Sequence, residues 1–428
     1  MACESHGGTQ LRQCTLGKLA IVAVMAVVAP VRSALPAADP VFSDAGPDPN
    51  GYGVAQGYQA QRGGALLPQR FMVGTYSRYD QLYPFHLVAK PPAPSLLRRA
   101  AQEITLDYRY QGATYTLDEY LQRNPTTGLL IARDETILFE HYQYGRTDRD
   151  RLLSQSMAKT VTSMLLGIAV SEGAIRSIDQ PAADYVPELA ASEYGKTPIR
   201  ALLHMASGVA FTEVYDGADD NAKLGRMRFG ADNPGAAKVL AQFKNREAPA
   251  GTRFHYASSE TQVLGLVIAN AVRMSLAEYL QSRIWQPMGV EADATWIVDT
   301  AGTEVASCCL NATLRDWARY GLLLAHDGAW NGRQIIPRQW VLDATSVEAP
   351  YLAPGTATRT MGYGYQVWLR PGGRRQFVLL GVHGQVIFVD PVTHLVLVHT
   401  AVRLKAAGDP AAAELYALWT ALVARYGG

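Results

Sequence analysis

A serine and a lysine three residues apart are the side chains in this sequence best suited to catalysis. Ser156 and Lys159 lie in the segment SQSMAKT, residues 154–160, where an apolar stretch begins. Residues three apart share one face of a helix, so the hydroxyl and the amine can meet. Burial and the positive end of the helix dipole both disfavour an ammonium, so a neutral Lys159 could take the Ser156 proton. The alternative is a serine that caps the helix, with a solvated lysine one turn later.

A tyrosine that could move protons follows 100 residues after Ser156. Tyr256 stands in the segment FHYASSE, residues 254–260, just before a second apolar stretch. A phenol close to an ammonium is expected to have a lowered pKa, and it could then shuttle protons. The alternative is a capping box in which Ser258 or Ser259 caps the next helix and Tyr256 only anchors it.

Composition narrows the classes of protein that remain. The chain has 428 residues, of which 48% are hydrophobic and 18% charged, so it can bury a large core. The net charge of +1 gives no reason to expect a nucleic-acid or acidic-membrane partner. The histidines are scattered without an HExxH motif, and there is no CxxC, so neither a metal nor a cofactor is expected. Cys308 and Cys309 are adjacent, a spacing at which a relaxed disulfide is rare.

The first segment of the chain has the pattern of an export signal. Arg12 and Lys18 precede the apolar run Leu19–Ala29, which Pro30 ends, and small residues follow. This pattern predicts a secretory signal peptide over residues 1–38, cleaved between about residues 33 and 38, and a secreted or periplasmic protein without stable membrane association. The run is short for a membrane span. Retention as an anchor, or a misassigned start with an apolar tail, are the alternatives.

The Gly- and Pro-rich composition of residues 39–68 predicts a flexible leader ahead of the folded part of the chain. Alternating and helical patterns predict these elements: strands at 129–133 and 136–140, helices at 157–171, 260–271, 277–285 and 314–326, strands at 364–369, 377–381, 386–390 and 395–400, and a helix at 411–426. The hairpin and the late strands can form one antiparallel sheet with helices on its faces. The fold class is therefore α/β (α+β), with a mostly helical insertion over about residues 180–340.

The Ser-x-x-Lys and Tyr-x-Ser elements resemble those of class C β-lactamases, penicillin-binding proteins and related esterases. β-Lactamases carry a Lys-Thr-Gly strand beside the site, whereas this chain has LGVHGQ at residues 380–385 and no lysine there. That segment is similar to the 6-aminohexanoate-dimer hydrolase branch of the family, as are TPIRALLHMASG at 197–208, RDWARYG at 315–321 and GYGY at 362–365. The resemblance covers roughly residues 69–428 and implies a β-lactamase/transpeptidase-like fold. The absence of Gly-x-Ser-x-Gly disfavours the α/β-hydrolase fold.

The resemblance also implies further roles at the site. The main-chain N–H groups of Ser156 and Val382 would form the oxyanion hole. Tyr215 would lie on a loop that borders the substrate cleft, although it could equally be an ordinary surface aromatic. Ser258 and His383 would line the substrate pocket, although His383 could instead be a core histidine that fixes its strand.

These residues together predict a serine hydrolase. Ser156 would attack a carbonyl carbon, Lys159 and Tyr256 would handle the protons, and water would release the acyl-enzyme, with no metal or cofactor. The expected substrates are carboxylic esters or small linear amides. A β-lactamase or D,D-peptidase is the first alternative, and the missing lysine argues against it, because that charge meets a substrate carboxylate. A non-catalytic ligand-binding or sensor protein on the same fold is the second. The physiological substrate and the oligomeric state stay open.

Overall fold

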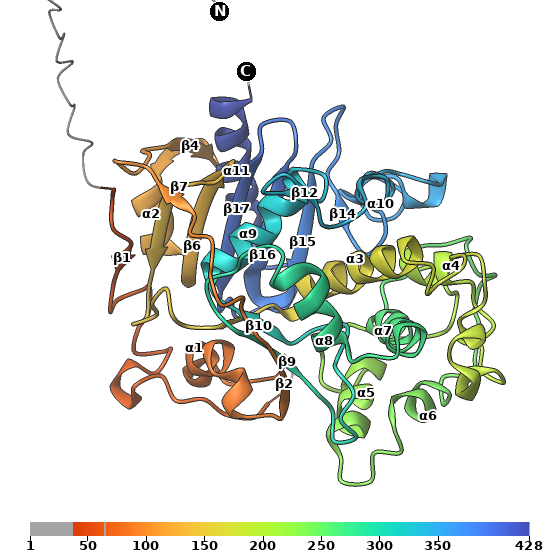
Figure 1. Cartoon of the computed structure of the whole chain (residues 1–428). Coiled ribbons are helices and arrows are strands. Elements are labelled where there is room, and N and C mark those ends of the chain that lie inside the picture. Colours follow the sequence, from red (N-terminus) through yellow and green to blue (C-terminus); the bar gives the residue numbers. More distant parts are fainter. Residues whose placement is uncertain (1–36, 64–65, 428) are drawn as a thin grey trace, which may run out of the picture. The chain divides into compact units, whose positions relative to one another are not determined.

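The computed structural model describes residues 37–63 and 66–427, so the apolar run Leu19–Ala29 lies outside the described residues (Figure 1). Its main sheet joins the early hairpin to the late strands, as the sequence predicts. The order is β1-β7-β6-β17-β16-β15-β14-β13, and β3 also pairs with β7. The strands are β1 (Val41–Phe42), β3 (Arg98–Arg99), β6 (Thr126–Arg133), β7 (Thr136–Tyr142), β13 (Gly362–Tyr363), β14 (Trp368–Leu369), β15 (Phe377–Gly381), β16 (Gln385–Asp390) and β17 (Leu395–Ala401).

Alternating side chains of the central strands give this sheet two apolar faces. Ile387 and Val396 contribute to one hydrophobic core, whereas Phe388 and Leu397 contribute to another on the opposite face. Helix α9 (Leu314–Ala325) covers the first face so closely that a Cβ added at Gly321 would lie 2.7 Å from a Val396 methyl. Helix α11 (Ala411–Tyr426) contributes its apolar residues to the second core. The sheet therefore lies between two helices, which hold its strands in place (Figure 1).

The helical part surrounds α3, which carries the lysine of interest. It consists of α3 (Ala158–Ser171), α4 (Ile199–Leu203), α5 (Asp220–Phe229), α6 (Ala236–Leu240), α7 (Ser258–Val272), α8 (Leu276–Leu280) and a π-helical turn (Gln281–Trp285). Helix α3 is buried along most of its length and packs against α7. The segments that carry Lys159 and Ser258 are thereby brought side by side, although they are 99 residues apart in sequence.

The expected helical insertion over residues 180–340 extends too far at its C-terminal end. Two strands within this range, β9 and β10, belong to a four-stranded sheet of order β2-β9-β10-β8. Its strands are β2 (Phe85–Val88), β8 (Leu152–Leu153), β9 (Ala294–Ile297) and β10 (Leu310–Ala312). After it, α9 packs on the main sheet, because its apolar face covers β16 and β17. The helical part thus ends near residue 290.

The expectation of a flexible leader over residues 39–68 is wrong for the described residues. Strand β1 pairs with β7, and the rings of Tyr52 and Tyr58 are buried. The Tyr52 hydroxyl donates to the Val402 carbonyl oxygen at 2.7 Å. Buried tyrosines offset the ordering cost that the Gly- and Pro-rich composition suggested would leave this segment loose. The described part of this segment belongs to the folded domain.

One predicted strand is also replaced. Residues 364–367 form a turn between the short strands β13 and β14, because Gln366 has a φ of 59°, and of the predicted strand only Trp368–Leu369 remains, as β14. The Gln366 carbonyl oxygen accepts from the Thr160 hydroxyl at 2.8 Å, so the turn is tied to α3. The remaining elements are α1 (Gln69–Ser77), α2 (Leu117–Arg123), α10 (Arg338–Ala344), β4 (Asp107–Tyr110), β5 (Ala113–Thr116), β11 (Ala329–Trp330) and β12 (Arg333–Gln334).

Within the described part of the chain, no single helix is long and apolar enough to cross a membrane. Only the bent pair formed by α7 and Leu276–Trp285 meets the length and composition criteria together.

Candidate active site

A short turn between β8 and α3 positions Ser156. Ser154 is fully buried, and its N–H and side-chain oxygen both bond to Leu310 of β10, at 2.9 and 3.2 Å. Gln155 adopts a left-handed φ of 46°, and the 3-10 turn Gln155–Met157 then leads into α3. Ser156 is half-buried and lines a cleft, whereas Ser154 is committed to holding the turn. The geometry therefore favours Ser156 as the nucleophile of this segment.

Lys159 lies one turn later with its amino group surrounded by acceptors. Its Nζ lies 3.0 Å from Ser156 Oγ, 2.8 Å from Ser258 Oγ and 3.0 Å from the Ser307 carbonyl oxygen. Burial lowers the Lys159 pKa to about 8, while the Glu213 charge raises it and the Arg228 charge lowers it further. A neutral amine has two N–H groups, which Ser258 and Ser307 can accept, and one lone pair, which can face the Ser156 hydroxyl. The expected Ser-x-x-Lys contact is thus present, and the lysine has the properties of a base.

A carboxylate that sequence reasoning did not single out completes this network. Glu213 accepts from the Ser258 N–H at 2.7 Å, from the Ser258 hydroxyl at 2.8 Å and from the Tyr215 hydroxyl at 2.9 Å. Ser258 is therefore held between Lys159 and Glu213, although it was expected as a pocket residue or as a helix cap. The one signal for Glu213 in the sequence is its position two residues before Tyr215. Tyr215 lies at the cleft as expected.

Tyr256 lies beside the lysine, but its expected pKa shift is wrong in sign. Its ring stacks on Trp368 with centroids 5.5 Å apart, and Lys159 Nζ lies 5.0 Å from its centroid. Burial raises the phenol pKa well above its ordinary value, the Glu213 charge raises it further, and a hydrogen bond with Ser156 only partly opposes this. The phenol therefore stays protonated, which suits a proton donor rather than a base.

The cleft above Ser156 has a volume of about 620 Å³ and brings most of the expected residues together. Val382 lines it at the end of β15, and a Cβ added to the preceding Gly381 would lie 2.6 Å from the Ser154 carbonyl oxygen. Only glycine permits so close an approach of β15 to the turn that carries Ser156. His383 lines the cleft too, and its Nδ1–H donates to the Arg403 carbonyl oxygen at 2.7 Å. It combines both expected roles, a pocket wall and a fixed, buried histidine.

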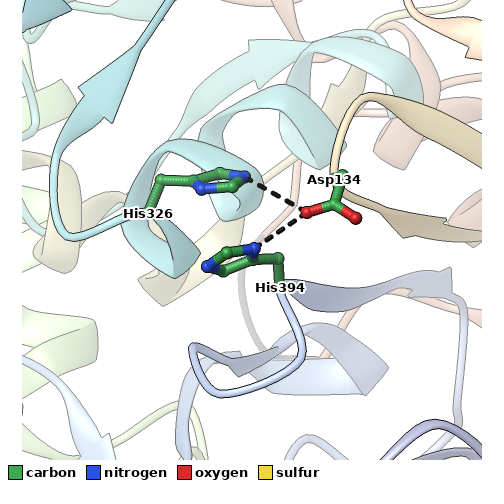
Figure 2. Close-up of side chains that lie close together, drawn as sticks. All are labelled: Asp134, His326 and His394. Carbon is green, nitrogen blue, oxygen red and sulfur yellow. Dashed lines mark hydrogen bonds and ion pairs between the residues drawn. The ribbon is translucent and has the colours of Figure 1, made fainter. Parts of the chain in front are cut away.

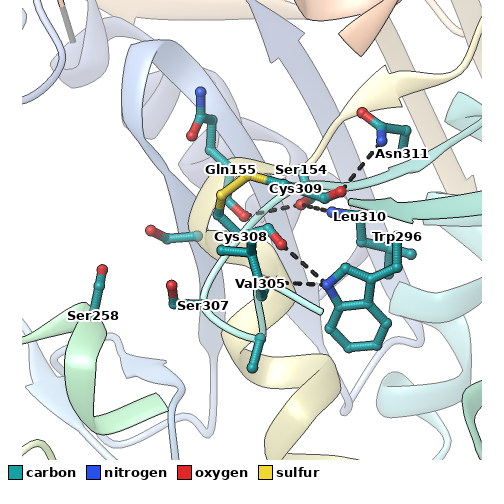
Figure 3. The surroundings of a disulfide bond; sticks show 12 residues. Ser154, Gln155, Ser258, Trp296, Val305, Ser307, Cys308, Cys309, Leu310 and Asn311 are labelled. Atoms are coloured by element: carbon teal, nitrogen blue, oxygen red, sulfur yellow. Dashed lines mark hydrogen bonds between the residues drawn. A yellow bond between two sulfur atoms is a disulfide. The ribbon is translucent and has the colours of Figure 1, made fainter. Parts of the chain in front are cut away.

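A disulfide joins the two adjacent cysteines, a pairing that is rare at this spacing and that the sequence left open (Figure 3). Cys309 adopts a left-handed φ of 71°, and both cysteines line the cleft directly after Ser307. The loop is held independently of the sulfur atoms. The Trp296 indole N–H donates to the carbonyl oxygens of Val305 and Cys308 at 3.0 and 3.1 Å. These bonds place the Ser307 carbonyl where it accepts from the lysine.

Among the residues that the structure describes, one group could hold a metal ion: Asp134, His326 and His394 (Figure 2). Asp134 lies in the β6–β7 turn and His394 in the β16–β17 turn, whereas the cleft borders the opposite ends of β15 and β16. The group therefore belongs to a different part of the molecule than Ser156.

Comparisons with known proteins agree with this fold. The family model described as Beta-lactamase matches residues 115–420. The chain is 29% identical over 293 residues to the 6-aminohexanoate-dimer hydrolase of Paenarthrobacter ureafaciens, covering 66% of this chain and 74% of that protein. A solved Bacillus anthracis protein assigned as a 6-aminohexanoate-dimer hydrolase has a TM-score of 0.74 and 25% identity, covering 83% and 94% of the two chains. EstCE1, a hydrolase with promiscuous acyltransferase activity, shares the fold with a TM-score of 0.57 and 14% identity, covering 70% and 94%.

Proposed function

Because the chain belongs to the β-lactamase family and is a hydrolase of that family, we propose that it cleaves carboxylic esters or small linear amides through an acyl-enzyme on Ser156. One observation carries this proposal. The buried amine of Lys159 lies 3.0 Å from the Ser156 hydroxyl, and burial lowers its pKa to about 8. A nucleophile with an adjacent, partly deprotonated base is the arrangement that acyl transfer requires.

In the acylation step, Ser156 Oγ forms a bond to the substrate carbonyl carbon while its proton passes to the Lys159 lone pair. The carbonyl oxygen becomes an oxyanion, which the N–H groups of Ser156 and Val382 stabilise. Collapse of this intermediate breaks the bond to the leaving group. The leaving oxygen or nitrogen takes a proton from the Tyr256 phenol, and the ammonium of Lys159 restores the phenol proton.

In the second step, water attacks the acyl-enzyme. Lys159 accepts a proton from the water as the new C–O bond forms, and it returns that proton to Ser156 Oγ as the ester bond breaks. Atoms and charges then balance, and the enzyme regains its starting protonation state. Ser258 and the Ser307 carbonyl hold the amine in one orientation through both steps, because they accept its two other N–H bonds.

The names of two similar proteins support the proposed substrate class. The Paenarthrobacter ureafaciens protein is named for hydrolysis of a 6-aminohexanoate dimer, and EstCE1 is named as a hydrolase with acyltransferase activity. Linear substrates also fit the absence of a lysine in the segment Leu379–Val382, which lies at the cleft end of β15. A substrate carboxylate held as in β-lactamases would find no ammonium at that strand.

A fluorophosphonate probe followed by mass analysis tests the proposal. One covalent adduct on Ser156 is expected, and Ser156→Ala should abolish both the adduct and ester hydrolysis. Ser259→Ala is a matched control, because this buried serine bonds to the Tyr194 hydroxyl and is not one of the three hydrogen-bond partners of Lys159. Labelling that persists in Ser156→Ala would refute the acyl-enzyme on Ser156. Failure of the unlabelled wild-type enzyme to hydrolyse any ester or amide would refute it as well.

A further inference from the structure

A buried arginine on the cleft wall has a side-chain nitrogen without a hydrogen-bond partner among the described residues. Arg228, in α5, is 5% exposed, and its Nη2 forms no hydrogen bond within the described part of the chain. Two other arginines of the same cleft are engaged: Arg62 Nε donates to the Leu82 carbonyl oxygen at 2.6 Å, and Arg226 Nη1 donates to that of Gly217 at 3.0 Å. A buried, unpaired guanidinium is costly, so it needs an explanation.

Two carboxylates, those of Asp299 and Glu213, act on Arg228 through their charges, but neither pairs with its guanidinium. The charges of Asp299 and Glu213 raise its pKa, but burial outweighs both and lowers it to about 10. Glu213 already accepts three hydrogen bonds from Ser258 and Tyr215. Asp299 accepts from two backbone N–H groups at 2.9 Å. Arg228 is therefore a cation at neutral pH with donors left for a ligand.

We propose that Arg228 binds a carboxylate of the substrate, so that the enzyme prefers esters or amides whose far end is anionic. This inference rests on the proposed function and specifies its substrate class. A guanidinium pairs with a carboxylate through two parallel hydrogen bonds, and the cleft of about 620 Å³ has room for a linear acyl chain between Ser156 and Arg228. Binding of the anion removes the cost of the unpaired charge, which gives the site its selectivity.

The test compares two p-nitrophenyl esters of equal chain length, one ending in a carboxylate and one in a methyl group. The measured quantity is the ratio of their kcat/KM values in wild type, Arg228→Met, Arg228→Lys and Arg226→Met. The wild type should favour the carboxylate, and Arg228→Met should lower the ratio by about 10- to 100-fold, as expected for a lost charge-assisted pair. Arg228→Lys should retain part of the preference. Arg226→Met, a cleft arginine with its own partner, should leave the ratio within about twofold.

The ratio separates binding from base strength. Arg228 also lowers the Lys159 pKa, so its removal changes the reactivity toward both esters, and that change cancels in the ratio. An unchanged ratio in Arg228→Met, with the methyl ester still cleaved, would overturn the inference and leave the proposed function intact. If wild type cleaves neither ester, the inference is tested by calorimetry of adipate binding. Wild type should bind this dicarboxylate, and Arg228→Met should not. Thermal unfolding of Arg228→Met checks the fold, and a melting temperature equal to or above wild type is expected, since an unpaired buried charge is removed.

A second inference rests on the separate group Asp134, His326 and His394 (Figure 2). His394 Nδ1 lies 2.8 Å and His326 Nε2 lies 3.9 Å from the same oxygen of Asp134. All three ligand atoms lie within 4.8 Å of one another, and closing to a tetrahedral ion needs movements of roughly 1 Å.

The geometry points to a site for a divalent transition-metal ion such as Zn²⁺, with Asp134, His326 and His394 as ligands and water completing the set. Such an ion would join the β6–β7 turn, the end of α9 and the β16–β17 turn, which are far apart in the chain. An ion that binds only the folded chain stabilises it, so it should raise the melting temperature.

Calorimetry and thermal unfolding of tag-free protein with ZnCl₂ test the site. One ion per chain and a higher melting temperature are expected, and both should be lost in His394→Gln and Asp134→Asn. His86→Gln is the matched control, because His86 Nδ1 also lies 2.7 Å from a carboxylate, that of Glu304, outside this group. Absence of saturable binding in wild type, or equal binding in His394→Gln, would overturn the inference.

Discussion

Changing Glu213 to glutamine should move the pH dependence of the enzyme in a direction that the structure fixes. The Lys159 pKa is about 8, so about 9% of the amine is neutral at pH 7. The two 2.8 Å hydrogen bonds through Ser258 place a Glu213 oxygen at most 5.6 Å, twice 2.8 Å, from Nζ. A unit charge at that distance is worth about 0.7 kcal/mol in water and about 3 kcal/mol at an effective dielectric constant of about 20. Its loss should lower the Lys159 pKa by about 0.5 to 2 pH units.

The assay is kcat/KM for a neutral p-nitrophenyl ester as a function of pH, followed at the isosbestic wavelength of p-nitrophenol. Only the neutral lysine is active, so wild-type activity should fall as pH decreases through about 8. In Glu213→Gln the same limb should lie at lower pH, even if the plateau drops because the amide cannot accept from every former donor. Tyr215→Phe removes one hydrogen bond to Glu213 without removing its charge, so its limb should stay near that of wild type. A limb that stays in place or moves upward in Glu213→Gln would refute Lys159 as the titrating base.

Three further predictions concern the other walls of the site. Tyr256→Phe should reduce amide cleavage about 10²- to 10⁴-fold more than ester cleavage, because an amine must be protonated to leave while an alkoxide needs less help; equal losses in parallel kinetics would assign the tyrosine elsewhere. The Cys308→Ser/Cys309→Ser double variant should change KM more than kcat, because the Trp296 indole holds this loop without the sulfur atoms; a kcat loss above about tenfold would show that the disulfide itself positions the lysine's acceptor. A chromogenic cephalosporin should be turned over far more slowly than a short-chain ester, because no lysine stands in the segment Leu379–Val382; comparable turnover would favour a β-lactamase.

The regular elements were predictable where one physical pattern dominates. Alternation in buried strands and 3.6-residue periodicity in helices predict β15 and α11 with the bounds that the structure has. The strand predicted at residues 364–369 failed because Gln366 turns the chain with a positive φ, which no apolar pattern encodes. The prediction of a flexible leader over residues 39–68 failed for a related reason. Its tyrosines find partners such as the Val402 carbonyl, far away in the sequence.

The residues of the site were also predictable only where their contacts are local in sequence. Ser156 and Lys159 were predictable because their contact is local to one helix turn. Glu213 was not, since its role depends on α7 bringing Ser258 against α3, a contact across 99 residues. The sign of the Tyr256 pKa shift was wrong because the nearby amine was visible in the motif, whereas the burial beside Trp368 was not. Sequence patterns thus predict which groups can react, and tertiary packing sets their protonation.

That packing couples substrate charge to base strength. Arg228 lowers the Lys159 pKa and Glu213 raises it, so the two charges oppose each other at the amine. A substrate carboxylate paired with Arg228 would cancel part of the lowering, and the Lys159 pKa should rise in the complex. The kcat profile reports the complex and the kcat/KM profile reports the free enzyme. With the carboxylate ester, the acid limb of kcat should therefore lie at higher pH than that of kcat/KM. With the methyl ester, which leaves Arg228 unpaired, the two limbs should lie closer together. If the two limbs lay farther apart for the methyl ester than for the carboxylate ester, the anion would bind away from Arg228. Substrate recognition would then not influence the Lys159 pKa through Arg228.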